Sequence, residues 1–159
     1  MTTRTLTAAE QAVRAHVIAI NLGRCAWCGT QEASNVCHRL PEGQCGPYLG
    51  LNLIPGCGSG NASGCHGATE RRRALSYSCG WLIRADTFRD NGRNARIAAV
   101  PALIRTPLAP DGAWHLLDSL EDGRPLGMPR LAEPGEVPTG MFAGTFADAL
   151  ARLHGRAVA

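Results

Sequence analysis

Seven cysteines and five histidines are the side chains of this 159-residue sequence best suited to bind metal ions. Four of the cysteines form two pairs: Cys25 and Cys28 in the segment CAWC, and Cys57 and Cys65 in the segment CGSGNASGC. Two thiolate pairs brought together at about 2.3 Å from a tetrahedral ion make a structural zinc site. The sequence therefore predicts a structural Zn²⁺ ion held by these four thiolates.

The second cysteine pair is more widely spaced than the first, because seven residues separate its two members. Five of the seven are glycine or serine, which fold readily into a tight turn. Unligated buried thiols and a phosphate-binding loop are the competing interpretations, but glycine-flanked positions suit a core poorly and the Gly-Lys-Ser/Thr ending of a P-loop is missing. A thiol-redox role for CAWC lacks the βαβ context that it requires.

Three polar residues, His38, Asn52 and His66, follow one another within this cysteine frame. With the segments CAWC, CHRLPEG, LNLIPGC and GCHG, they make residues 24–75 resemble the HNH endonuclease family. The family pattern is a C-x2-C knuckle, a histidine at the end of a strand, an asparagine that opens Asn-Leu, and a cysteine pair followed at once by histidine or asparagine. The glycine-rich second pair and the later Gly-Trp pair are most similar to small HNH proteins of actinobacterial phages, which implies a phage or prophage origin.

The resemblance implies a ββα-metal fold, in which a two-stranded ribbon packs on a helix and a divalent ion between them meets a DNA phosphate. Phosphodiester hydrolysis needs a base that activates water and a cation that neutralises charge on the phosphate. By the resemblance, His38 is the base, Asn52 holds the loop that orients it, and His66 binds a catalytic Mg²⁺, Mn²⁺ or Ni²⁺ ion. An imidazole with a pKa near 6.5 suits the role of the base.

Cys37 departs from the family pattern, because many members have aspartate or histidine before the base as a second ligand of the catalytic ion. A thiolate is a poor ligand for a hard ion such as Mg²⁺. Three explanations are open: His66 holds the ion with water and DNA oxygens, the ion is a softer one such as Mn²⁺, Ni²⁺ or Zn²⁺, or the site is inactive. Cys37 is kept as a candidate ligand, and Glu70 lies one helical turn after His66.

All sixteen basic residues are arginine, which partly reflects the coding bias of a GC-rich genome. Arg39 and the run Arg71, Arg72 and Arg73 flank the proposed site and are predicted to contact DNA phosphates. For the arginines from residue 84 onward, contact with DNA phosphates and a solvated surface are equally good interpretations. Nuclease activity and a non-cleaving, zinc-stabilised DNA-binding or regulatory module are therefore the two functions to be separated.

Several elements must position these residues. Helical periodicity and a Thr7–Glu10 capping box predict a helix over residues 7–21. The segments NVCHRL and LGLNLIP read as two strands, and ATERRRALSY as a helix. Later segments predict strands in GWLIRA, AAVPALIRT and AWHLLDSL, turns at residues 90–92 and 110–112, an irregular stretch over 121–138 and a helix over 141–153.

The predicted fold class is α+β, with residues 1–79 as an N-terminal helix plus a zinc-stabilised ββα-metal core and residues 80–159 as a small mixed C-terminal extension. No apolar run is long enough to cross a bilayer, and the first twenty residues lack the apolar stretch of a signal peptide. We therefore expect a cytoplasmic protein with DNA as partner, in which cysteines bind metal instead of forming disulfides. Cys45 and Cys79 are expected to be small core residues.

Overall fold

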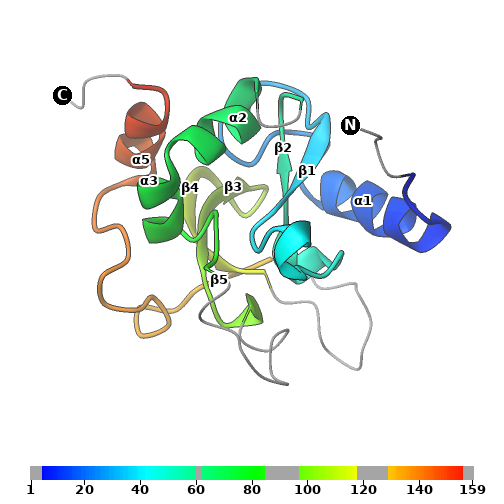
Figure 1. The fold of residues 1–159 in the computed structure, drawn as a ribbon. Helices are drawn as coiled ribbons and strands as arrows, with labels where there is room; N and C mark the ends of the chain where they lie inside the picture. The colour runs from blue at the N-terminus through cyan, green and yellow to red at the C-terminus, as the bar shows by residue number, and fades with distance from the viewer. Residues whose placement is uncertain (1–4, 60–61, 85–96, 118–128, 156–159) are drawn as a thin grey trace.

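The computed structural model describes residues 5–59, 62–84, 97–117 and 129–155 (Figure 1). Short helices alternate with two small antiparallel sheets, which confirms the predicted α+β class. The predicted turn at residues 90–92 and part of the irregular stretch lie outside the described residues. In chain order the elements are α1 (Ala8–Ile20), β1 (Asn35–His38), η1 (Glu42–Gln44), η2 (Gly50–Asn52), β2 (Leu53–Gly56), α2 (Gly64–Arg71), α3 (Arg73–Ser78), β3 (Ala102–Thr106), β4 (Ala109–Leu116), β5 (Arg130–Leu131) and α5 (Phe146–Leu153).

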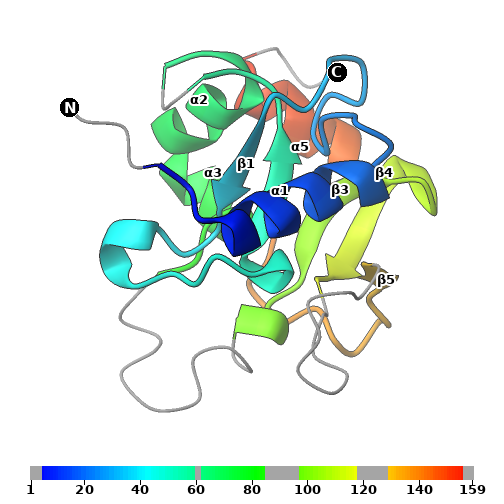
Figure 2. The same cartoon turned by 90° about the vertical axis from the view of Figure 1, so that its right-hand side faces the viewer.

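The N-terminal helix α1 forms as predicted. The Thr7 hydroxyl accepts a hydrogen bond from the Glu10 amide, and the Glu10 carboxylate accepts one from the Thr7 amide at 2.8 Å, so the capping box is complete. The helix lies across the ribbon of β1 and β2 (Figure 2), where Val17 packs against Val36 and Leu53. This small apolar cluster fixes α1 on the ribbon.

Strands β1 and β2 pair antiparallel, with Asn35 opposite Gly56 and His38 opposite Leu53. Helix α2 follows β2 and packs against it. The predicted single helix over residues 68–77 begins four residues earlier, at Gly64, and breaks at Arg72, whose φ and ψ of −115° and 53° are not helical. Glycine is a poor helix former, so the first turn of α2 gives no helical signal in the sequence.

The second sheet has the order β3-β4-β5. The predicted strand GWLIRA is wrong for residues 80–84, which the structure describes as turn and irregular chain. The predicted turn at residues 110–112 is also wrong, because the hairpin turns at Pro107 and Leu108 and Gly112 lies inside β4 with a φ of +90°. A Cβ atom at Gly112 would come within 2.2 Å of the Phe146 ring, so glycine permits close packing of α5 here.

The main hydrophobic core joins both predicted parts of the chain. Trp27 and Trp81 meet edge to face in this core, with ring centroids 6.2 Å apart. The Arg105 amide donates to the Ala26 carbonyl at 2.8 Å, and α5 lies against α2 and α3 (Figure 1). Trp81, β3 and α5, which all follow position 79, thus pack into the same core as the cysteine pairs. No helix of the described residues is long and apolar enough to span a membrane.

Candidate functional site

The four paired cysteines form one cluster, as predicted. Cys25 and Cys28 belong to the turn after α1, Cys57 directly follows β2, and Cys65 lies in the first turn of α2. Their sulfur atoms all lie within 4.8 Å of one another, and the Cys28 and Cys57 sulfurs are 3.9 Å apart. Sulfurs at the corners of a tetrahedral zinc site stand about 3.8 Å apart. The cluster, called the metal centre below, can therefore bind a structural metal such as zinc.

Backbone hydrogen bonds and glycines hold Cys57 and Cys65 close together. The Cys65 amide donates to the Cys57 sulfur at 3.4 Å, and the His66 amide donates to the Cys57 carbonyl at 3.2 Å. Gly58 and Gly64 have positive φ, and a Cβ atom on Gly64 would stand 2.4 Å from the Cys57 carbonyl oxygen. The glycines thus allow the wide second cysteine pair to close, as the sequence predicted.

The pKa values of the thiols show that the four side chains interact closely. A hydrogen bond from Cys65 lowers the pKa of Cys25 to about 5 and raises the pKa of Cys65 itself. Burial raises the pKa of Cys57. Neighbouring thiolates repel one another, so four of them in this space require a positive ion at their centre.

His38 ends β1 and is half-buried, with its ring against Tyr48 at a centroid distance of 5.2 Å. Asn52 is fully buried beside the loop that follows His38. Its side-chain oxygen accepts from the Leu40 amide at 2.8 Å, and its side-chain nitrogen donates to the Leu40 and Pro47 carbonyls at 3.0 and 3.1 Å. Three hydrogen bonds from one amide therefore hold both sides of this loop.

His66 stands on α2 directly after a cysteine of the metal centre. Burial lowers its pKa, an effect that the carboxylate of Glu70 partly opposes. Its Nδ1 atom is buried without a hydrogen-bond partner among the described residues. A neutral imidazole with an unused ring nitrogen has the donor chemistry that a divalent cation requires.

Cys37 is buried, with 5% of its surface exposed, and packs in the main core. Burial raises its pKa well above the usual thiol value, and negative charge at Cys25, Glu70 and Cys57 raises it further. Successive residues of a strand point to opposite faces, so Cys37 and His38 face different sides of β1. A neutral, buried thiol gives no support to the prediction that Cys37 binds a hard catalytic ion.

Arg39 is the clearest correction to the predicted site. Its side chain is fully buried and donates to the carbonyls of Gly80 at 2.8 Å, Leu51 at 3.2 Å, Val100 at 2.5 Å and Pro101 at 3.3 Å. Burial lowers its pKa to about 9, so the guanidinium remains charged at neutral pH. The prediction that Arg39 contacts DNA phosphates is wrong, because it joins the ribbon to the C-terminal segment instead.

The other predicted phosphate-binding arginines are exposed. Arg71 donates to the Ala62 carbonyl at 3.0 Å, and Arg72 donates to the Leu153 carbonyl at 3.1 Å. Arg73 pairs with Glu70 at 3.1 Å on the surface. Each guanidinium has more N–H groups than these contacts use, so all three arginines can still donate hydrogen bonds to a phosphate. Of the two cysteines expected in the core, Cys79 is buried and Cys45 is exposed.

Two residues of the C-terminal segment reach the metal centre, and the sequence gives no signal for either. The Nε2 atom of His154 lies 3.6 Å from the Cys65 sulfur, although 89 residues separate them in the chain. Arg105 donates to the Cys28 carbonyl at 3.3 Å across a separation of 77 residues. Both line a surface hollow of about 720 Å³ beside the metal centre.

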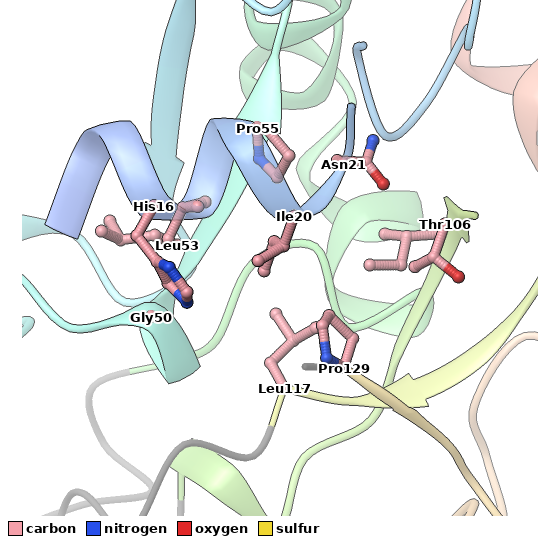
Figure 3. Close-up of a pocket in the computed structure, with 11 residues that line it drawn as sticks. His16, Ile20, Asn21, Gly50, Leu53, Pro55, Thr106, Leu117 and Pro129 are labelled. Atoms are coloured by element: carbon pink, nitrogen blue, oxygen red, sulfur yellow. The ribbon is translucent and has the colours of Figure 1, made fainter. Parts of the chain in front are cut away.

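A second cavity lies between α1 and the β3-β4 hairpin (Figure 3). It is mostly apolar, with Ile20, Leu53 and Leu117 among its lining residues and His16 at one end. Its volume of about 20 Å³ suits one water molecule. This space is a packing interface of α1 and is too small for an organic ligand.

Comparisons of the chain with protein-family models, curated proteins and solved structures found no match. The function is therefore inferred from the residues and their geometry.

Proposed function

We propose that the protein is a metal-dependent HNH endonuclease that hydrolyses phosphodiester bonds of DNA, with a Zn²⁺ ion at the metal centre. The observation that carries the proposal is that two features of the family pattern occur together in the structure. Asn52 clamps the loop beside His38 at the end of the ribbon, and α2 presents His66 directly after Cys65 of the metal centre. Ribbon and helix would then form a ββα-metal core.

In the proposed reaction, the imidazole of His38 takes a proton from water as the water oxygen attacks phosphorus. Asn52 keeps the loop in place so that His38 faces this water. His66 would hold a divalent cation, which would supply positive charge to the phosphate and to the leaving oxygen as the P–O3′ bond breaks and this oxygen takes a proton from water. Exposed arginines Arg71 and Arg73 hold the DNA backbone, and the products carry 5′-phosphate and 3′-hydroxyl ends.

The structural ion has a separate task. Cys25, Cys28, Cys57 and Cys65 would hold it, and it would thereby join the turn after α1, the end of β2 and the start of α2. Binding of such an ion is coupled to folding, so the ion fixes the position of α2 and therefore of His66.

Nicking of supercoiled plasmid tests the proposal. Wild-type protein is incubated with Mg²⁺, Mn²⁺ or Ni²⁺, and the nicked product is quantified over time. Removal of a general base lowers the rate by about 10²- to 10⁴-fold, which is the loss expected for His38→Ala. His16→Ala, which removes an imidazole from α1, serves as the control and should cleave like wild type. Equal rates for wild type and His38→Ala would exclude His38 as the base.

The neutral, buried state of Cys37 favours a second candidate function, because it leaves the catalytic ion without the second ligand seen in many members of the family. In this alternative the protein binds DNA through the same fold without cleaving it. DNA binding by wild-type protein, together with no nicking in any of the three ions, would establish this binding module in place of the nuclease.

A further inference from the structure

We propose that a surface hollow formed by α2, α3 and the C-terminal segment extends the DNA-backbone contact of Arg71 and Arg73 to Arg72 and Arg152. The hollow has a volume of about 560 Å³ and is called the arginine hollow below. None of its eight described lining residues is acidic: Arg71, Arg72, Arg73, Ala74, Leu75, Ser78, Phe142 and Arg152. This inference rests on the proposed function in taking DNA as the partner and in its use of Arg71 and Arg73, and Arg152 of α5 is the residue that it adds.

The positive charge of the arginine hollow is available to a ligand. Arg71 and Arg72 use backbone carbonyls as their acceptors and pair with no carboxylate among the described residues. Arg73 has one surface ion pair, with Glu70, and such exposed pairs contribute little energy. Asp148 lies close enough to Arg152 to interact with it, but its hydrogen bonds come from Thr145 at the start of α5 and it forms no direct ion pair with Arg152 in the described part of the chain.

Contacts between distant parts of the chain hold the arginine hollow in shape. The Phe142 amide donates to the Ser78 carbonyl at 2.9 Å, which fixes the segment before α5 to the end of α3. The Arg152 guanidinium lies over the Phe142 ring, 5.3 Å from its centroid. On the other side, Arg72 donates to the Leu153 carbonyl. Arginines held in this way lose little conformational entropy when they bind a ligand.

A nucleic-acid backbone fits this chemistry better than an acidic protein surface. Guanidinium groups bind phosphate oxygens through two parallel hydrogen bonds, and phosphates supply half or more of the hydrogen-bond contacts in protein–DNA complexes. The position is also suitable, since Arg71 follows His66 by five residues, or about 7.5 Å along the axis of α2. Arg71 borders the hollow beside the metal centre as well, which extends the basic surface to Arg105. A duplex bound near His66 can therefore reach the arginine hollow.

The test measures DNA binding without cleavage, with zinc-loaded protein in buffer that contains no free divalent ion. Fluorescence anisotropy with a labelled duplex compares wild type, Arg152→Gln and Arg24→Gln at several salt concentrations. Arg24 is an exposed arginine outside the hollow that also donates to a carbonyl, that of Thr30. We expect Arg152→Gln to bind about 5-fold more weakly and to lower the slope of log K against log salt by about one, as for the loss of one phosphate contact.

Equal losses in Arg152→Gln and Arg24→Gln would overturn the inference, because they would show only the effect of net charge. A labelled poly-aspartate peptide is the second probe. If Arg152→Gln weakens binding of the peptide and leaves DNA binding unchanged, the hollow takes an acidic protein and the inference is wrong. Plasmid nicking is measured separately. If wild type nicks plasmid and Arg152→Gln binds DNA as tightly as wild type, this inference is wrong and the proposed nuclease function stands.

Discussion

Replacement of Arg39 by methionine separates a structural role from a role in DNA binding. The side chain donates four hydrogen bonds, to the carbonyls of Leu51, Gly80, Val100 and Pro101. In Arg39→Met all four carbonyls lose their donor, while the methionine side chain refills most of the space. A buried carbonyl without a donor costs about 1 kcal/mol or more, so the variant should lose about 4 kcal/mol of folding free energy.

Thermal unfolding followed by circular dichroism measures this loss. In a protein of this size, 1 kcal/mol corresponds to about 2–4 °C, so Arg39→Met should unfold roughly 8–16 °C below wild type. Arg71→Met removes the same charge from an exposed position and should change stability by less than about 0.5 kcal/mol. If Arg39→Met unfolds at the wild-type temperature, the four hydrogen bonds do not stabilise the fold by the expected amount. DNA affinity of the folded variant should equal that of wild type, because the Arg39 side chain is fully buried.

Three further predictions concern the metal centre, acid stability and packing. Cys57→Ser should lower both the zinc content, measured by atomic emission, and the unfolding temperature, whereas Cys45→Ser, at an exposed cysteine outside the centre, should change neither. Burial holds the pKa of His115 below 6.5, so the unfolded chain takes up the proton first and stability falls as the pH drops below 6.5. Urea titrations at several pH values give the unfolding free energy as a function of pH. In His115→Gln the slope of this free energy against pH should be shallower than in wild type by up to about 1.4 kcal/mol per pH unit. Gly112→Ala should cost about 2 kcal/mol or more, because its methyl group overlaps an aromatic ring of α5, while Gly135→Ala, with open space around it, should be neutral by the same urea assay.

Local signals in the sequence predicted the elements that depend on neighbouring residues. The capping box at Thr7 fixed the start of α1, and the predicted helix over residues 141–153 is found as α5, although it begins five residues later, at Phe146, where Thr145 forms a capping box that was not predicted. The two cysteine pairs predicted the metal centre, because ligand spacing and glycine content are visible along the chain. Such features need no knowledge of distant contacts.

Features set by distant contacts could not be predicted. Arg39 reads as a surface arginine beside a histidine, but its acceptors lie up to 62 residues away. Gly112 follows proline and aspartate, as a turn glycine would, yet its role is set by Phe146 on α5. His154 reaches the metal centre only because α5 packs against α2. In each case tertiary packing decides the role of a residue whose local sequence indicates another one.

The most direct test of the proposed nuclease is chemical rescue of His38→Ala by free imidazole in the plasmid-nicking assay. The half-buried position of His38 at the end of β1 leaves space for a small base when the side chain is removed. We expect His38→Ala to fold and bind metal like wild type, to nick plasmid at least about 100-fold more slowly, and to recover activity as imidazole is added. Nicking by His38→Ala at the wild-type rate without imidazole would contradict the proposal.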